Sequence, residues 1–463
     1  MLRSPWLNAL KETLHLQGSP VFESRNIPDV SEILSAANLW ARALARKRLL
    51  AAQGFKSGDV LCELSLSQDL LVNLIACNML DGCFFPLKKS EFEELLTNEA
   101  SDLPVYLWNN LGLAKAYCNA DQAVQIRNAK TDSVLLLKTS GTTGLQKYVG
   151  ISGDAILHQV KSFISVLDLK PEDGRLIVLP LHHCFGLILD LMLGLFAKQT
   201  IFLRSELKFE AAMIFDLLKQ HEIRHISLVP RMVELLVIHA EQNPLEAPLL
   251  RSLHVHVGGA MIGETLRTKA TKLFGGWVEG YGLTECAGGV LLNGKPNNCE
   301  VKLKPSFDSN VIHHAELWVK SPAIGKFANQ NEFDAEGFFN TGDLARLTSD
   351  RGIEVVGRAG QLIKDQRGLW VDLNSLQEKI QQQMKTEPIW IYRHGCEIRV
   401  AIIQEDENKS NLITNYLESH FSLKVAILVV EKSLILKIIS DSQKKSSQEA
   451  LAEWVGKVHV SGL

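Results

Sequence analysis

The sequence predicts an α/β protein. We expect a large N-terminal part with helix-covered, mainly parallel sheets plus a small β-rich region, followed by a small mobile α+β C-terminal domain. Three observations predict this architecture. The chain has 463 residues, 46% of them hydrophobic, which is enough for two or three domains with large cores. Short β-like runs recur about every 25 residues, the spacing of strand–helix–strand units. After residue 300 the pattern changes to short strands and turns.

The first element that the pattern predicts is a helix over residues 29–54. Asp29 is a capping residue, Glu32 follows three positions later as in a capping box, and Gly54 is a typical helix stop. Apolar residues at helical spacing predict its buried face, namely Ile33, Ala37, Trp40 and Leu44.

Five β-like runs follow in the middle of the chain, separated by helical patterns. The runs are "RLIVL" at 175, "TIFLR" at 200, "HISLV" at 225, "SLHVHV" at 252 and "GWVEGY" at 276. The helical patterns between them include Ala211–Lys219 and Val233–Ala240. This alternation favours parallel sheets covered by helices, in which ligands bind at the carboxyl ends of the strands. Glycine-rich loops begin at those ends, after Thr139, at Gly258 and at Gly282.

The same pattern predicts two domains. We expect residues 1–359 to form the large N-terminal domain and residues 360–463 to form a smaller α+β lid, of a plausible domain size. Within the first, "AELWVKS" and "DRGIEVVGRAGQ" are expected to be strands of the β-rich region.

Composition and charge exclude several classes of protein. The net charge of −3 and the pI near 6.5 do not favour nucleic acid or an anionic membrane surface as a partner. The eight cysteines are scattered without a C-x-x-C pair, so we expect neither disulfides nor a zinc site, and a reducing, cytoplasmic compartment. The N-terminus lacks the continuous hydrophobic region of a signal peptide. The apolar segment 176–196 contains Pro180, His182, His183 and Asp190, which predicts a core segment rather than a membrane span.

One stretch of small and hydroxyl-bearing residues has the properties of a phosphate cradle. It does not match the P-loop of nucleotide hydrolases, because Gln146 stands where that motif needs glycine. Glycines allow successive backbone N–H groups to turn toward one anion, hydroxyls add donors, and a lysine adds charge. The residues concerned are Thr139, Ser140, Gly141, Thr142, Thr143, Gly144 and Lys147. A flexible surface turn is the alternative interpretation.

Three further stretches supply the other groups that a nucleotide site needs. In "GYGLTE" (280–285), Tyr281 offers an aromatic face, Thr284 a hydroxyl and Glu285 a carboxylate for Mg²⁺. In "GFFNTGDL", Asp343 follows a Thr-Gly turn and can accept two sugar hydroxyls. In "EVVGRAGQLIK", Arg358 can pair with ribose or phosphate. Each stretch alone is a weak signal, but their order and spacing together are specific.

With these four stretches, the sequence resembles the adenylate-forming (AMP-binding) superfamily of acyl-CoA and aryl-CoA synthetases, luciferases and adenylation domains. The resemblance covers nearly the whole chain. Besides the four stretches above, it includes "LDGCFFPLK" (80–88), "PLHHCFGL" (180–187) and "VGGAM" (257–261).

The resemblance implies a two-step reaction in which a carboxylate attacks the α-phosphate of ATP and a thiol then displaces AMP. It implies that Lys147 and the surrounding loop hold the β and γ phosphates, and that Thr284 grips the α-phosphate. Glu285 would hold Mg²⁺. By the same resemblance, Tyr281 and the backbone at Gly259 and Ala260 flank adenine, whereas Asp343 and Arg358 hold the ribose.

Some positions depart from the family pattern. The lysine that bridges the carboxylate and the α-phosphate corresponds to Lys437 in "EKSLILKI", although Glu431 and Leu436 replace the proline and glycine of that motif. A solvated lysine at the end of a strand is the alternative. The hinge position falls on Gly360, and the loop after it lacks the proline of the family, which places the thiol step in more doubt than adenylation.

The histidine segment bears on the substrate. The resemblance implies that His183 gates the substrate pocket, whereas His182 is expected in its wall and the alternative for both is a satisfied core histidine. Cys184 stands where amino-acid-activating members carry an aspartate, which argues against an α-amino acid. The alternating His254 and His256 have no third ligand nearby, so a metal site is not expected there.

The sequence therefore predicts an acid-thiol ligase. It is expected to use ATP and Mg²⁺ to activate an aryl or fatty carboxylate and to transfer it to phosphopantetheine, on CoA or on an acyl carrier protein. We weigh two alternatives: adenylation without efficient thioester formation, and a nucleotide-binding scaffold with little turnover.

Overall fold

The chain forms two compact units, each with its own sheets. The structure, a computed structural model, describes the following residues: 5–15, 35–64, 69–96, 103–109, 112–118, 120–140, 146–203, 209–305, 315–326, 332–358, 362–364, 370–373, 376, 380, 390–394, 397–402, 407–420 and 424–429. The first unit comprises residues 1–300 and 320–337, and the second comprises residues 301–319 and 338–463. The β-rich region after residue 300 is thus grouped with the C-terminal part, and the boundary predicted at residue 360 stays a prediction.

The first sheet of unit 1 has six strands in the order β4-β3-β1-β2-β5-β6. Its strands are β1 (Val60–Glu63), β2 (Cys83–Pro86), β3 (Pro104–Asn109), β4 (Gly112–Tyr117), β5 (Leu135–Ser140) and β6 (Gln146–Ile151). The four central strands are parallel, and β4 and β6 are antiparallel edge strands. Successive residues point to opposite faces: Leu61 and Phe84 join one hydrophobic core, whereas Val60 and Cys62 join another. Both faces of this sheet are therefore covered.

The second sheet has seven strands in the order β13-β12-β11-β10-β9-β7-β8. Its strands are β7 (Gly174–Ile177), β8 (Thr200–Leu203), β9 (Ile223–Leu228), β10 (His254–Val257), β11 (Gly276–Tyr281), β12 (Leu291–Leu292) and β13 (Lys295–Pro296). The five longer strands are parallel, and they coincide with the five β-like runs of the sequence. The predicted parallel sheet is confirmed.

Helices cover both sheets of unit 1. One core lies between the sheets and is built on helices α1 (Pro5–His15), α2 (Ala36–Ala52), α3 (Asp69–Asn78), α6 (Gly153–Leu167), α7 (Cys184–Gly186), η1 (Leu187–Met192) and α8 (Leu193–Phe196). The outer face of the first sheet is covered by α4 (Lys89–Leu95) and α5 (Ala120–Lys130). The outer face of the second is covered by α9 (Ala211–Gln220), α10 (Pro230–Gln242), the 3₁₀ turn η2 (Ala247–Ser252) and α11 (Glu264–Leu273).

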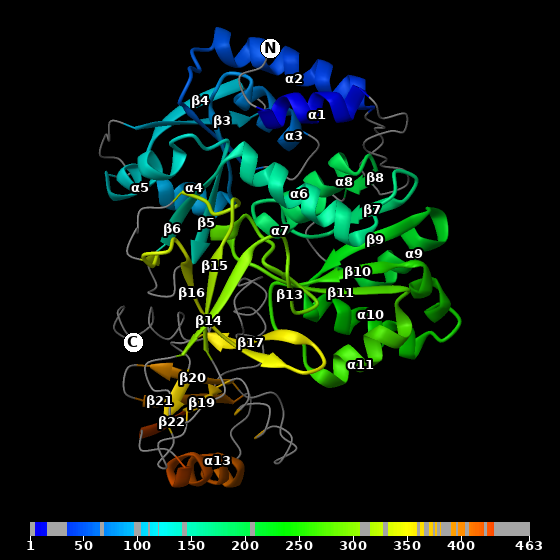
Figure 1. Ribbon diagram of the computed structural model, residues 1–463, viewed down its shortest axis with the longest axis vertical. Coiled ribbons are helices and arrows are strands. Elements are labelled where there is room, and N and C mark those ends of the chain that lie inside the picture. The colour runs from blue at the N-terminus through cyan, green and yellow to red at the C-terminus, as the bar shows by residue number, and fades with distance from the viewer. Residues whose placement is uncertain are drawn as a thin grey trace. The chain divides into compact units, whose positions relative to one another are not determined.

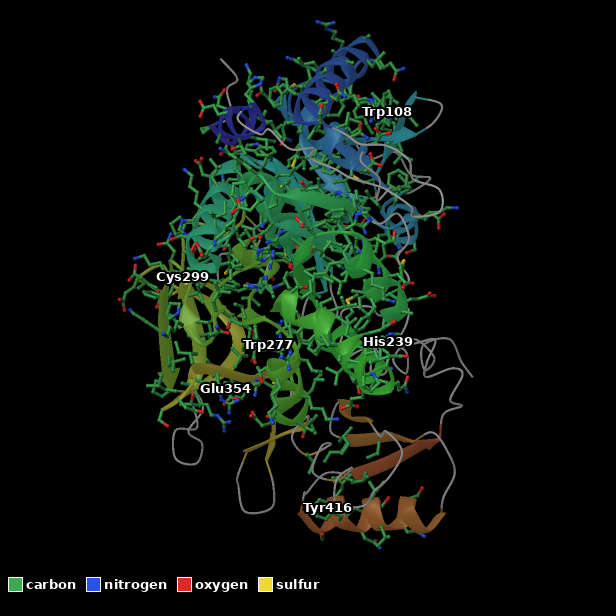
Figure 2. All side chains as sticks on the ribbon, turned by 90° about the vertical axis from the view of Figure 1, so that its right-hand side faces the viewer. Trp108, His239, Trp277, Cys299, Glu354 and Tyr416 are labelled. Carbon is green, nitrogen blue, oxygen red and sulfur yellow. The ribbon has the colours of Figure 1, made fainter. Side chains whose placement is uncertain are left out.

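The outer helix layer of the second sheet is visible in both views. Figure 1 shows α10 and α11 beside β10 and β11. Phe215 of α9 stacks on His239 of α10, labelled in Figure 2, with ring centroids 4.4 Å apart. The predicted helices at Ala211–Lys219 and Val233–Ala240 are confirmed as parts of α9 and α10.

The prediction for the N-terminal helix is wrong in its start and in part of its buried face, in which Trp40 is confirmed and Ile33 lies outside the described residues. Helix α2 begins at Ala36, because the extended residue Ser35 caps it by accepting a hydrogen bond from the backbone N–H of Asn38. Ala37 is exposed and the side chain of Leu44 is 40% exposed. The buried face consists of Ala36, Leu39, Trp40, Ala43 and Leu50. Asp29 lies outside the described residues, and the predicted stop is confirmed because Gly54 has φ +92°.

The apolar segment 176–196 is buried in the core between the sheets, as predicted. It includes η1, a short π-helical stretch, whose residues are all buried. Asp190 in this stretch is fully buried and accepts hydrogen bonds from Arg175 at 2.9 Å and from Ser227 at 2.9 Å. In the part of the chain that the structure describes, no helix has the length and apolarity to cross a membrane.

Unit 2 contains three smaller sheets. A four-stranded sheet consists of β14 (Glu300–Pro305), β15 (Ala315–Lys320), β16 (Phe339–Thr348) and β17 (Gly352–Arg358). A two-stranded sheet consists of β18 (Leu362–Lys364) and β19 (Trp370–Asp372). A three-stranded sheet consists of β20 (Trp390–His394), β21 (Glu397–Ile402) and β22 (Lys424–Val429), with helix α13 (Glu407–His420) between its last two strands. A small core that includes Ile413 and Leu417 of α13 supports this α+β part.

Candidate functional site

The predicted phosphate cradle connects the two strands of a β-hairpin. Strands β5 and β6 pair antiparallel, and Thr139 lies opposite Lys147 in the register. Ser140 ends β5, and Gly141, Thr142, Thr143 and Gly144 lie outside the described residues. The hydroxyl oxygen of Thr139 is buried and has no hydrogen-bond partner in the described part of the chain.

Lys147 forms an ion pair with a distant carboxylate. Its amine lies 2.6 Å from a carboxylate oxygen of Glu332, which is 185 residues away in sequence. The two side chains are 29% and 23% exposed, so the ion pair is partly shielded from water. Sequence reasoning assigned this lysine to phosphate and gave no signal for its carboxylate partner.

The two glycine-rich loops after β10 and β11 lie next to each other. These strands are parallel neighbours, with Val257 opposite Glu279. A Cβ on Gly258 would come within 2.9 Å of the backbone oxygen of Gly280, so the loop after β10 closely approaches the end of β11. The carboxyl ends of β10 and β11 therefore bring together the exposed Gly259 and Ala260 and the half-buried Tyr281. This edge is where the sequence placed adenine.

The 3₁₀ turn η3 (Thr284–Cys286) follows β11 and carries Thr284 and Glu285. A Cβ on Gly282 would lie 1.2 Å from the backbone oxygen of Gly288, so only glycine can stand at this position. The chain turns back at Ala287 and Gly288, which both have positive φ. Both side chains that the sequence assigned to phosphate and metal are thus placed on a tight turn with little conformational freedom.

A segment from far along the chain joins this turn to the hairpin. The N–H of Gly325 donates to the backbone oxygen of Glu285 at 2.7 Å. The next residue, Lys326, pairs with Gly150 of β6 through two backbone hydrogen bonds, of 2.7 and 2.8 Å. Glu285 and the strand that carries Lys147 are therefore attached to two adjacent residues of one segment. This is the closest structural link between the predicted phosphate and metal residues.

Gln159 of α6 also fixes the turn, and sequence reasoning missed it. Its side-chain amide donates to the backbone oxygens of Cys286 and Gly289, each at 2.8 Å, and the residue is 1% exposed. The signal was present, because Gln159 interrupts the buried face that Ile156, Val160 and Phe163 form on the helix. A buried amide on such a face needs hydrogen-bond partners.

We expect Gln159→Leu to loosen the turn that carries Glu285. In the reaction that the resemblance implies, the Mg²⁺ concentration that gives half-maximal pyrophosphate release should rise several-fold, because two bonds worth about 1 kcal/mol each are lost. The matched control is Ser162→Ala, which removes the 2.7 Å hydrogen bond from the same helix to Asn297. An unchanged Mg²⁺ dependence in Gln159→Leu, with the variant folded by its urea midpoint, would exclude this role.

The histidine segment contacts the same turn. The thiol of Cys184 lies 3.5 Å from the hydroxyl of Thr284, and the rings of His182 and His183 have centroids 4.1 Å apart. His182 is buried and His183 is half-buried. Whether His183 gates a substrate stays a prediction, as does the wall role of His182.

His256 lies in the core beneath the loops. Its ring is 5.0 Å from that of Phe185 and 5.3 Å from that of Phe163. Burial lowers the pKa of His256 to about 3, with a smaller contribution from Arg175, so the imidazole is neutral at pH 7. In the described residues no group of three or more His, Cys, Asp or Glu side chains could hold a metal ion, and the cysteines there are free thiols.

The two residues that the sequence assigned to ribose lie in unit 2. Asp343 of β16 and Arg358 of β17 are opposite each other in the register, and their side chains form an ion pair at 2.7 Å. Asp343 is 4% exposed, and its N–H donates to the hydroxyl of Thr341 at 3.1 Å. The structure therefore brings these two residues together. Lys437, Glu431, Leu436 and Gly360 lie outside the described residues.

Comparison with known proteins identifies the family. The family model described as "AMP-binding enzyme" matches residues 86–328, more than half of the chain. The chain belongs to the AMP-binding enzyme family. The matched range contains the phosphate hairpin, the histidine segment and the η3 turn. The resemblance to adenylate-forming enzymes that the motifs indicated is confirmed.

Individual relatives of this AMP-binding protein are distant. It is 27% identical over 301 residues to the oxalate–CoA ligase of Arabidopsis thaliana, an alignment that covers 60% of this chain and 57% of that protein. Several curated CoA-ligase relatives are about twice as long as the part that this chain matches. The chain spans about half the length of the curated relatives it matches.

Solved structures confirm the fold. ATP-bound MatB from Rhodopseudomonas palustris superimposes with a TM-score of 0.70 at 18% identity, covering 94% of this chain and 99% of that one. The o-succinylbenzoate–CoA synthetase MenE from Bacillus subtilis, in complex with AMP, gives a TM-score of 0.71 at 19% identity, covering 92% and 95% of the two chains. The predicted α/β fold class is therefore confirmed.

Proposed function

We propose that this AMP-binding protein is an acid-thiol ligase that activates a small aryl or fatty carboxylate with ATP. The carboxylate oxygen would attack the α-phosphate, the bond to pyrophosphate would break, and the acyl-adenylate would then be attacked by the thiol of phosphopantetheine. AMP leaves in that second step. CoA and an acyl carrier protein are both acceptors under this proposal.

One observation carries the proposal: the segment that contains Gly325 and Lys326 attaches Glu285 and the strand of Lys147 to each other. Family membership alone does not specify chemistry. A cation and a carboxylate on rigid elements of one unit match what a nucleotide polyphosphate with its metal requires. We call Thr139, Lys147, Thr284 and Glu285 the phosphate site.

The residues present fit the nucleotide and its metal. The buried hydroxyl of Thr139 has no hydrogen-bond partner in the described part of the chain, and Lys147 binds the carboxylate of Glu332. Both observations support an anion at this position. Carboxylate oxygen is the ligand type that Mg²⁺ prefers, and Glu285 offers it. When bound, Mg²⁺ supplies positive charge beside the reacting phosphates. Lys147 would bind the β and γ phosphates and Thr284 would orient the α-phosphate.

The remaining residues take supporting roles in the proposal. Tyr281 and the backbone at Gly259 and Ala260 would cover adenine, and Asp343 would accept the ribose hydroxyls. The ion pair with Arg358 supports this role, because it holds the buried carboxylate of Asp343 in place. We also propose a cytoplasmic location, consistent with the free thiols of the described cysteines.

The experiment that tests the function measures pyrophosphate release over a panel of aryl and fatty acids, with Mg²⁺ and ATP. We expect release that depends on the acid, and AMP formation that rises when CoA or an acyl carrier protein is added. Pyrophosphate release that neither CoA nor a carrier protein stimulates would support adenylation without thioester formation. Tight ATP binding with no release for any acid would favour the scaffold and contradict the proposal.

Lys437 gives a separate prediction about the first step. Since its amine is proposed to bridge the carboxylate and the α-phosphate, Lys437→Ala should slow pyrophosphate release by about a hundredfold or more. The dissociation constant of ATP should change little, because the other phosphate contacts remain. The neighbouring Lys432→Ala is the matched control. Equal rates for Lys437→Ala and wild type would exclude Lys437 from the reaction.

A further inference from the structure

The ion pair between Lys147 and Glu332 gives the phosphate site an internal anion. Lys147 lies on β6, and Glu332 lies in the last part of unit 1, five residues before Gly337 ends it. The contact of 2.6 Å is a charge-assisted hydrogen bond between side chains that are partly shielded from water. The pair therefore differs from an exposed surface salt bridge, whose contribution is small.

The geometry has a direct consequence for ligands. An amine that donates to a carboxylate at this distance offers less of its charge and fewer of its N–H groups to another anion. A polyphosphate that binds Lys147 must therefore displace or share Glu332. The two anions would otherwise repel each other within a few ångströms.

We propose that Glu332 is a positioning residue that acts through Lys147 and sets the affinity of the site for polyphosphate. Its carboxylate holds the lysine amine in the nucleotide-free protein and is exchanged for the β and γ phosphates when ATP binds. The inference rests on the proposed function, in which Lys147 binds those two phosphates. It concerns charge exchange alone, and no covalent bond changes.

This exchange distinguishes nucleotides by their phosphates. ATP and inorganic pyrophosphate compete with Glu332 for Lys147, whereas AMP has no β or γ phosphate and does not. Glu332 thus weakens the binding of ATP and pyrophosphate and leaves AMP binding unchanged. When pyrophosphate leaves, the carboxylate of Glu332 pairs with Lys147 again, which speeds release of that product.

The test measures dissociation constants by calorimetry for Mg·ATP, AMP and inorganic pyrophosphate in the full-length protein. Glu332→Gln should lower the constants for Mg·ATP and pyrophosphate about fivefold, the factor that corresponds to a partly exposed ion pair, and leave that for AMP unchanged. Glu336→Gln is the matched control, because Glu336 is exposed in the same segment. In a Lys147→Met background, Glu332→Gln should give a smaller gain, because it then removes only the repulsion between its carboxylate and the polyphosphate.

Three results would overturn the inference: unchanged affinities for both polyphosphates, an equal change for AMP, or the same gain without Lys147. The choice of probes distinguishes a failure of this inference from a failure of the proposed function. A gain in pyrophosphate affinity without acid-dependent AMP formation supports the ion exchange and contradicts the ligase. Acid-dependent AMP formation with no effect of Glu332→Gln contradicts the ion exchange alone. Absence of binding for ATP and pyrophosphate in every variant overturns both.

Discussion

Glu285→Gln should reduce pyrophosphate release by about 10²- to 10³-fold at saturating substrate and Mg²⁺, the typical loss for one group that stabilises transition-state charge. The substitution keeps the shape of the side chain and removes its negative charge, so the metal loses its proposed carboxylate ligand. The backbone contact of Glu285 with Gly325 does not depend on the side chain, and we expect the turn to stay in place.

The control for this prediction is Glu300→Gln, which removes the same charge at an exposed position of unit 1. AMP binding should be kept in Glu285→Gln, because adenine and ribose are proposed to bind elsewhere. A loss of less than threefold, with Mg²⁺ dependence as in the wild type, would show that Glu285 does not hold the metal.

Arg175→Met should destabilise the protein by about 3–5 kcal/mol at pH 8, the cost of leaving a buried charge without its partner. Arg175 of β7 is 2% exposed and donates to Asp190 at 2.9 Å and to Gln199 at 2.8 Å. The second carboxylate oxygen of Asp190 has no hydrogen-bond partner in the described residues. Without the guanidinium, the carboxylate would keep only the hydroxyl of Ser227.

The pH dependence of this loss follows from the pKa of Asp190. Burial raises this pKa from 3.8 to about 6, against the lowering effect of Arg175. A carboxyl group with a raised pKa in the folded state holds its proton longer there, so stability falls as pH rises from about 4 to 6. Removing Arg175 raises the pKa further, because its lowering effect is lost. The destabilisation by Arg175→Met should therefore be larger at pH 8 than at pH 5.

Urea unfolding at both pH values measures this prediction. The double variant Arg175→Met with Asp190→Leu removes both charges and should recover most of the lost free energy of unfolding. A loss below about 1 kcal/mol in the single variant, or a double variant that is less stable than the single one, would contradict the account of this buried pair.

The parallel sheet was predictable because its signal is local. Runs such as "RLIVL" and "HISLV" are rich in β-branched and apolar residues and alternate with amphipathic helices, and both properties act within a few residues. The helix start was mispredicted for a related reason. Asp29 and Ser35 are both good capping residues, and the helix is capped by Ser35, directly before the apolar face of Ala36, Leu39 and Trp40.

The contacts that build the site were not predictable in the same way. The motifs predicted roles for Lys147, Glu285 and Asp343, but the sequence contained no signal for the carboxylate partner of Lys147. It marked Gln159 as a polar residue on an apolar helix face, without indicating which groups it binds. Glu332 lies 185 residues from Lys147, and Gln159 lies 127 residues from Cys286. Such pairs arise from tertiary packing, which a single sequence does not encode in any local pattern. Glu332 is therefore the main addition that the structure makes to the site.

The central proposal is that Lys147 and Glu285 bind the phosphates and the metal ion of one nucleotide. A crystal structure of the protein with Mg²⁺ and a non-hydrolysable ATP analogue tests it most directly. The account predicts a single nucleotide with its β and γ phosphates at Lys147 and the metal ion at Glu285. A nucleotide that binds away from either of these side chains would contradict it.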